Sequence, residues 1–191
     1  MVKLLIRRLL GRVALRGLLP FVAMPVSALW NGFVSWRVLR EARIRAMGPS
    51  AIEELVKAAF DCAPQHSPES RLSAVRAVGS AIVRTQELHP NLVRLLKAVA
   101  QSAGELGSHE LDDVGLFLSN LKTLSPSELK LSLQVLAVAC VVDGRLSPRE
   151  RKLWSDALET AGRPPGQREL SQLLRAFVSG DRNAEELLRA M

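Results

Sequence analysis

The sequence predicts an all-α protein, a compact orthogonal bundle of about seven helices preceded by an apolar N-terminal helical hairpin. Helix-forming Ala, Leu, Arg and Glu dominate its 191 residues. Apolar residues make up 48% and aromatic residues only 4%, without any Tyr, which disfavours β-sandwiches and base-stacking surfaces. Signals for helix starts and stops recur along the chain, and no window alternates as a strand would.

The formal charge of +7 is concentrated at one end of the chain. Nine Lys and Arg residues against Glu41 give residues 1–47 a charge of +8, which leaves −1 for residues 48–191. Nucleic-acid binders normally spread basic charge over a folded face, so nucleic acid is not an expected partner. Basic charge beside apolar sequence favours an anionic membrane surface. We therefore expect a membrane-associating segment over 1–49 and a helical domain over 50–191, separated at "MGPS".

The first segment contains twenty uncharged residues, Gly17–Trp36, which could just cross a bilayer. Pro20 and Pro25 interrupt this stretch, and a proline within a helix removes a backbone hydrogen bond. Basic residues flank both ends, and the positive-inside rule is met most simply if both ends stay on the cytoplasmic side. These features predict a re-entrant hairpin bent near Pro20–Pro25, or a segment that lies in the interface.

Several side chains of this segment have the chemistry of membrane contacts. Arg8, Arg12 and Arg16 are four residues apart and share a helical face, and tryptophans suit the headgroup level. The residues expected to contact the membrane are Arg8, Arg12, Arg16, Phe21, Trp30, Trp36, Arg37 and Arg40. Two other interpretations stay open. The hairpin packs on its own domain or on a protein partner, or the Arg-rich segment is a cleaved targeting peptide.

Sequence signals for helix starts and ends are clear in the remainder of the chain. A Ser followed three residues later by Glu forms a capping box, and Pro suits the first helical position. Such starts, with or without the full box, occur at Ser50, Ser67, His89, Ser108, Ser125 and Ser147, and glycines mark helix ends. The predicted helices are 2–16, 26–46, 51–62, 68–87, 91–103, 109–122, 126–142, 148–161, 167–178 and 182–190.

The helix predicted over 126–142 is apolar nearly all round, which is typical of the buried centre of a helical domain. Cys140 falls within it, and Cys62 lies far away in another apolar context. We expect both to be buried, reduced thiols rather than a disulfide.

Common catalytic signatures are absent: the sequence has no GxGxxG, Walker loop, HExxH or GxSxG motif. His66, His89 and His109 lie far apart at predicted helix starts, where they suit caps or surface positions. The sequence thus predicts a protein that is not an enzyme, and acid–base catalysis by clustered carboxylates is the alternative.

The stretch "VVDGRLSPRE", Val141–Glu150, combines a helix end with a helix start. Gly144 can end the first helix, and Ser147 and Glu150 can cap the next. These roles explain the turn without Asp143. An acid at this position is unfavourable, because it faces the negative end of the dipole of the preceding helix. Asp143 could bond the turn's amides as an Asx-turn, or a cation could lie between Asp143 and Glu150.

The stretch "LAVACVVDGRLSPRERKLW", Leu136–Trp154, resembles the alanine-rich helix and "ADGxLSxxE" corner of TerB-like domains, bacterial helical modules named from tellurite-resistance proteins. In that family two such corners carry acidic residues implicated in metal binding. The second corner matches Asp143 and Glu150, and the first would fall near Asp61 and Glu69 without its Gly. The resemblance therefore implies a divalent cation at these four residues, and oxygen ligands favour Ca²⁺, Mg²⁺ or Mn²⁺.

The stretch "LLPFVAMPVSALWNGFVSWRVLREAR" resembles the tail of EcsC-type bacterial proteins. Together the two resemblances imply a non-enzymatic, membrane-associated TerB-like module at the cytoplasmic face of a bacterial inner membrane. Its expected role is protein interaction or stress and metal sensing, with an unidentified protein partner. The alternative is a divalent-cation-binding regulatory domain whose N-terminal hairpin packs on a protein partner rather than on lipid.

Overall fold

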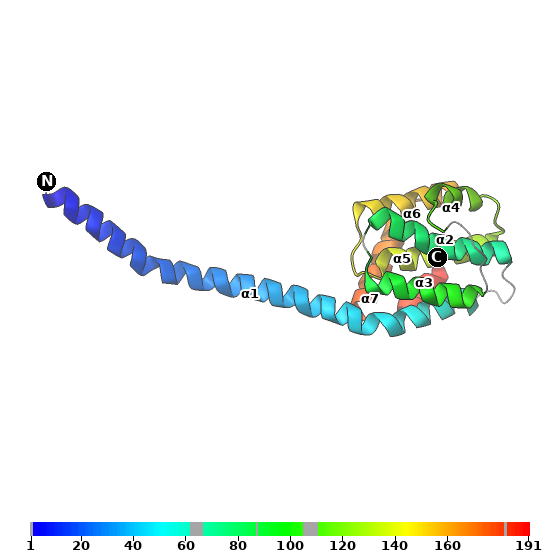
Figure 1. Ribbon diagram of the computed structural model, residues 1–191, viewed down its shortest axis with the longest axis horizontal. Helices are drawn as coiled ribbons and strands as arrows, with labels where there is room; N and C mark the ends of the chain where they lie inside the picture. Colours follow the sequence, from blue (N-terminus) through cyan, green and yellow to red (C-terminus); the bar gives the residue numbers. More distant parts are fainter. Residues whose placement is uncertain (1, 62–66, 87, 105–110, 182) are drawn as a thin grey trace. The chain divides into compact units, whose positions relative to one another are not determined.

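The structure is a computed structural model that describes residues 2–61, 67–86, 88–104, 111–181 and 183–191, with side chains from Met24 onward. Within these residues the fold is all-helical, as predicted, with eight helices and no strand (Figure 1). The helices are α1 (Val2–Asp61), α2 (Pro68–Thr85), α3 (Pro90–Ala103), α4 (Val114–Asn120), α5 (Pro126–Val141), α6 (Pro148–Thr160), α7 (Gln167–Ser179) and α8 (Asn183–Ala190).

The chain forms two compact units, Met1–Ala42 and Arg43–Met191. We call the second unit the bundle. Helices α2 and α5 are at its centre: α2 packs against α3, α4, α5 and α6, and α5 also packs against α6, α7 and α8. Together these two helices contact every other helix from α3 to α8, which makes the bundle compact.

Helix α5 is the most completely buried helix of the bundle, which confirms the prediction from its apolar sequence. Every residue from Leu131 to Val141 is buried. Its two polar side chains within this stretch have partners on other helices. The Ser132 hydroxyl donates to Ser73 Oγ at 3.0 Å, and Gln134 Nε2 donates to the Leu188 carbonyl at 2.7 Å. These hydrogen bonds join α5 to α2 and α8 and offset part of the cost of burying polar atoms. Among the described residues, the buried Gln134 Oε1 has no hydrogen-bond partner.

The predicted N-terminal hairpin is wrong, because α1 is a single helix from Val2 to Asp61. Proline weakens a helix at one hydrogen bond without always ending it. The predicted helix start at Ser50 is wrong for a similar reason, since Gly48 and Pro49 also lie within α1. Gly48 is needed there for packing: a Cβ on Gly48 would collide with the side chain of Asn91.

Most other predicted helix starts are confirmed. Ser67 and His89 cap α2 and α3, and Ser125 and Ser147 begin α5 and α6 with full capping boxes. The predicted start at Ser108 lies outside the described residues. The helix found there, α4, is shorter than the predicted 109–122, because Asp113 Oδ1 caps it by accepting from the Leu116 amide at 2.9 Å.

Candidate functional site

The corner Val141–Glu150 has the geometry of a tight turn between α5 and α6. Gly144 has a φ of 74°, in the left-handed region, and its amide donates to the Val141 carbonyl at 2.9 Å. Asp143 Oδ1 accepts from the Arg145 amide at 2.8 Å, which is the predicted Asx-turn. Glu150 Oε2 accepts from the Ser147 amide at 2.7 Å, and Ser147 Oγ accepts from the Glu150 amide at 3.2 Å. The turn interpretation of this sequence is therefore confirmed.

Asn91 connects this corner to two helices, a role that sequence reasoning missed. Its side chain is 2% exposed. Asn91 Nδ2 donates to the Val142 carbonyl at 2.8 Å and to the Ile44 carbonyl at 3.2 Å. The first bond satisfies a carbonyl at the end of α5, where the helix offers no partner of its own. The sequence did contain a signal for this role. Asn91 lies four residues before Leu95, so both share the buried face of α3, where a polar side chain needs hydrogen-bond partners.

The chemistry of Cys140 is governed by its surroundings. Burial raises the pKa of this thiol well above its usual value, and the negative charges of Glu150 and Asp143 raise it further. The thiol is therefore protonated at neutral pH, which removes it as a nucleophile or thiolate ligand. Cys140 is a free, buried cysteine, as predicted, and Cys62 lies outside the described residues.

The carboxylates expected to bind a cation have different environments. Glu150 is buried and Asp143 half-buried, whereas Asp61 and Glu69 are exposed at the end of α1 and the first turn of α2. Most of the first corner, residues 62–66, lies outside the described part of the chain. In the described part, no three or more His, Cys, Asp and Glu side chains are grouped closely enough to hold a metal ion. Cation binding therefore stays a prediction from the resemblance.

Of the three histidines, the structure describes only His89, which lies at the start of α3. His89 Nδ1 accepts from the Asn91 amide at 3.2 Å, so His89 is a helix cap, as expected. His66 and His109 lie outside the described residues.

The unit Met1–Ala42 carries an aromatic stripe, which we define as Trp30, Phe33 and Trp36 of α1. The ring centroids of Trp30 and Phe33 are 6.2 Å apart, and those of Phe33 and Trp36 are 6.5 Å apart. The Arg37 guanidinium lies 5.9 Å from the Phe33 ring centroid, and that of Arg40 lies 6.0 Å from the Trp36 ring centroid. The stripe is thus continuous with two cations on the same face of the helix.

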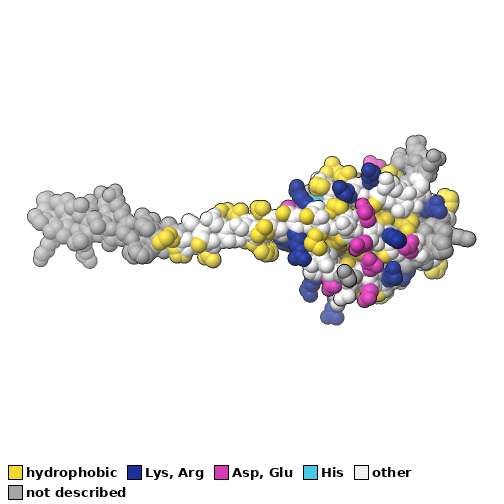
Figure 2. Space-filling view, turned by 90° about the horizontal axis from the view of Figure 1, so that it is seen from below, with side chains coloured by type: hydrophobic (Ala, Val, Ile, Leu, Met, Phe, Trp, Pro, Cys, Tyr) yellow, Lys and Arg dark blue, Asp and Glu magenta, His cyan; other side chains and the backbone are white. Residues whose placement is uncertain are grey.

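Large apolar side chains of this unit are exposed, as the yellow side chains along α1 in Figure 2 show. Trp30 is 64% exposed and Trp36 is 59% exposed. The exposed large apolar residues here are Met24, Val26, Leu29, Trp30, Phe33, Val34, Trp36, Val38 and Leu39. In the described chain, no helix is both long and apolar enough for a membrane span.

The structure brings together four of the eight residues expected to contact a membrane. Trp30, Trp36, Arg37 and Arg40 share one face of α1 through the aromatic stripe. The structure does not describe the side chains of the other four residues, which are Arg8, Arg12, Arg16 and Phe21.

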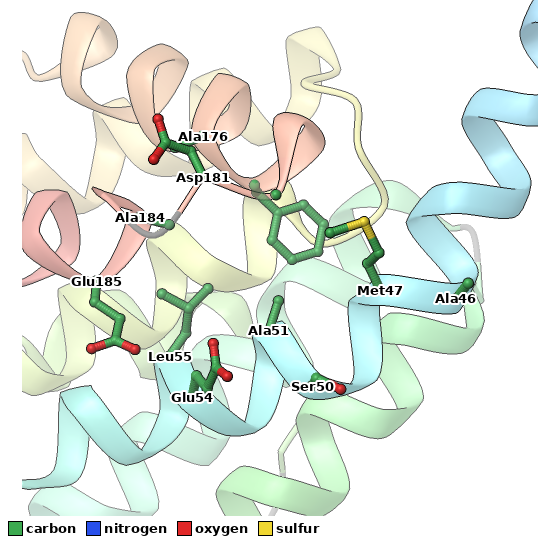
Figure 3. Close-up of a pocket in the computed structure, with 12 residues that line it drawn as sticks. Ala46, Met47, Ser50, Ala51, Glu54, Leu55, Ala176, Asp181, Ala184 and Glu185 are labelled. Atoms are coloured by element: carbon green, nitrogen blue, oxygen red, sulfur yellow. The ribbon is translucent and has the colours of Figure 1, made fainter.

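The bundle contains a second candidate site, a groove of about 410 Å³ between α1 and the α7–α8 region (Figure 3). We call it the acidic groove. Its lining residues are Ala46, Met47, Ser50, Ala51, Glu54, Leu55, Ala176, Phe177, Gly180, Asp181, Ala184 and Glu185. Leu55 and Phe177 are buried beneath it, and Glu54, Asp181 and Glu185 supply three carboxylates. Sequence reasoning missed this site because its two sides are more than 120 residues apart in the chain.

Comparison of the chain with models of known protein families, with curated proteins and with solved structures finds no match.

Proposed function

We propose that this chain is a non-enzymatic, TerB-like helical module held at the cytoplasmic face of a bacterial inner membrane by its first unit. At the membrane it acts as a protein-interaction or stress-sensing element. The observation that carries the membrane half is the exposed aromatic stripe with Arg37 and Arg40 stacked beside it.

The stripe has the chemistry of the lipid headgroup region. Tryptophan is enriched there because its ring is apolar at one end and can donate a hydrogen bond at the other. Arginine binds phosphate groups through paired N–H donors, and Arg37 and Arg40 place such donors beside the rings. Basic residues near an anionic surface contribute about 1 kcal/mol each, and residues 1–47 have a formal charge of +8.

The opposite face of the helix favours an orientation in the plane of the membrane. Ser27, Asn31 and Ser35 are four residues apart, so they line one side of α1, roughly opposite the aromatic stripe. Exposed Met24 and Val38 also lie on this side, so the helix is only partly amphipathic. Such a helix binds at the interface with its aromatic face in the headgroup and acyl boundary. This arrangement replaces the predicted re-entrant hairpin as the mode of attachment.

The TerB-like part of the proposal is supported by the corner between α5 and α6. Asp143 and Gly144 form the turn, and Ser147 and Glu150 form the capping box. These are the positions that carry the resemblance. The non-enzymatic part is supported by the lack of catalytic motifs in the sequence and by the protonated state of Cys140.

Flotation of the full chain with lipid vesicles tests the membrane half. Wild type is expected to float with phosphatidylcholine vesicles that contain phosphatidylglycerol, to float poorly with pure phosphatidylcholine, and to bind less at high salt. The double substitution Trp30→Ala/Trp36→Ala should remove most of the binding, and Arg37→Gln/Arg40→Gln should remove its dependence on anionic lipid.

Matched controls come from the exposed face of α3. Val93→Ala removes an apolar side chain that is 50% exposed, and Arg94→Gln/Lys97→Gln removes two exposed positive charges. These variants should bind vesicles as wild type does. Absence of wild-type flotation, or equal losses in stripe and control variants, would refute membrane attachment and favour a protein partner for the stripe.

A further inference from the structure

We propose that the acidic groove binds the basic helical segment 2–16 of a second copy of this chain, so that two copies associate in solution. The proposal does not rest on membrane attachment, although both would use the same segment.

The charge of the acidic groove favours a basic occupant. None of the twelve lining residues is Lys or Arg, whereas Glu54, Asp181 and Glu185 are acidic. Arg189 Nη2 lies 3.9 Å from Glu185 Oε2 in an exposed pair, which contributes little. At the Gly180 end the Arg43 guanidinium also lies beside the groove, where its Nη2 donates to the Ser179 carbonyl, so the three acids exceed these two cations by one charge. The groove therefore presents a negative potential to an approaching helix.

The shape and lining of the groove suit a helix with an apolar ridge. Ala51, Ala176 and Ala184 are small, and they leave space above Leu55 and Phe177. Figure 3 shows α1 on one side of this space and the end of α7 with the start of α8 on the other. Recognition of an amphipathic helix uses such a cleft between helices, with apolar anchors on the floor and charges at the rim.

The chain itself contains a segment with the required chemistry. Residues 2–16 are helical in α1 and contain five Lys and Arg residues and no acid. Arg8, Arg12 and Arg16 share one helical face, and Ile6 and Leu10 lie roughly opposite them. The apolar side can contact the floor of the groove while arginines at its edges meet Glu54, Asp181 and Glu185. A second copy supplies this segment with its helix α1 intact.

Reciprocal docking, in which each copy gives its segment to the other's groove, closes a two-fold dimer. Because lipid and groove would compete for the same arginines, anionic vesicles should dissociate this dimer. Salt should also weaken it, since screening reduces the attraction between the segment and the groove.

Sedimentation velocity of the full chain measures this association. Wild type is expected to dimerise with increasing concentration at about 0.05 M salt and to dissociate at about 1 M salt. Glu54→Arg/Glu185→Arg in the groove and Arg8→Glu/Arg12→Glu in the segment should each raise the dimer dissociation constant at least tenfold. Glu53→Arg/Glu159→Arg, which changes exposed acids outside the groove, serves as the matched control and should dimerise as wild type does.

The decisive sample is a mixture of the two charge-reversed variants. In the mixture each reversed groove can bind a reversed segment, and each native groove a native segment, so a heterodimer should form although neither variant dimerises alone. Circular dichroism of each variant checks that it is folded. The proposal is overturned if wild type is monomeric up to about 0.1 mM, because the dimer dissociation constant would then lie well above that concentration. It is equally overturned if the mixture stays monomeric, or if dimerisation is lost with Trp30→Ala/Trp36→Ala and kept in the groove variant.

Discussion

Helix α5 and the stretch of α1 from Met24 to Leu39 are both rich in apolar residues, but their environments are opposite. All residues from Leu131 to Val141 are buried in α5, whereas Leu29 in α1 is 75% exposed. Helix α5 is surrounded by α2, α6, α7 and α8. The described part of the unit Met1–Ala42 is one helix, so its apolar side chains have no neighbouring helix within that unit. Apolar content therefore does not decide burial, which requires partner helices.

Buried and exposed apolar residues have different consequences for the protein. Apolar area buried inside the bundle stabilises the folded chain. Contiguous apolar area left exposed marks a surface that binds lipid or another protein. Under the proposed function the exposed aromatic stripe and its arginines belong to the second category, whereas the buried helix α5 belongs to the first.

The largest expected effect is a difference in the free energy of unfolding between one substitution in α5 and one in α1. Leu136→Ala in α5 should lower the free energy of unfolding by about 2–5 kcal/mol, because it leaves a cavity in a fully buried layer. Phe33→Ala in α1 should change it by less than about 0.5 kcal/mol, because Phe33 is half exposed. Chemical denaturation of the two variants measures both values. A loss above 1 kcal/mol for Phe33→Ala would show that the stripe packs within its own molecule, since exposed residues seldom reach that value.

A smaller effect is expected at the polar residue that closes the end of α5. Asn91→Ala removes both side-chain hydrogen bonds to the Val142 and Ile44 carbonyls and should cost about 1–3 kcal/mol. Asn183→Ala, an exposed Asn in the first turn of α8, is the matched control and should cost less. Thermal unfolding compares the two. Equal losses would mean that the Asn91 side chain does not hold the corner to α1.

The smallest effect concerns the start of α5 and depends on pH. Hydrogen bonds from the Ser67 hydroxyl and then from the hydroxyl and amide of Ser125 lower the pKa of Glu128 from 4.5 to about 2. Because the folded pKa is the lower one, the charged carboxylate stabilises the fold fully above pH 4.5. This contribution is lost as the pH falls from 4.5 to about 2.

Glu128→Gln tests this contribution. The variant should be less stable at neutral pH by up to about 1 kcal/mol, the usual value of a helix cap. Its stability should also fall less steeply than that of wild type between pH 4.5 and 2. Denaturation curves at several pH values give both results, with Glu53→Gln as the control for an exposed carboxylate. Parallel pH profiles for wild type and Glu128→Gln would contradict the lowered pKa.

Local signals predicted the bundle helices well because capping depends on neighbouring residues. Ser67, His89, Ser125 and Ser147 begin helices as predicted, since the atoms of each cap are only a few residues apart. The same local rules failed at Ser50. There α1 continues through Gly48 and Pro49, and Gly48 packs against Asn91, which is 43 positions away in the chain.

The sequence by itself determined the helical class, most helix starts, the concentration of basic charge at one end and the turn at Asp143 and Gly144. These features arise from interactions within about one helical turn, or from composition alone. Only the tertiary structure decided that α1 continues through its prolines and that Asn91 joins α3 to α1 and α5. It also decided that Glu54 lines one groove with Asp181 and Glu185. Such features depend on which distant segments meet, and the packing of whole helices settles that, because burial is gained only when complementary faces come together.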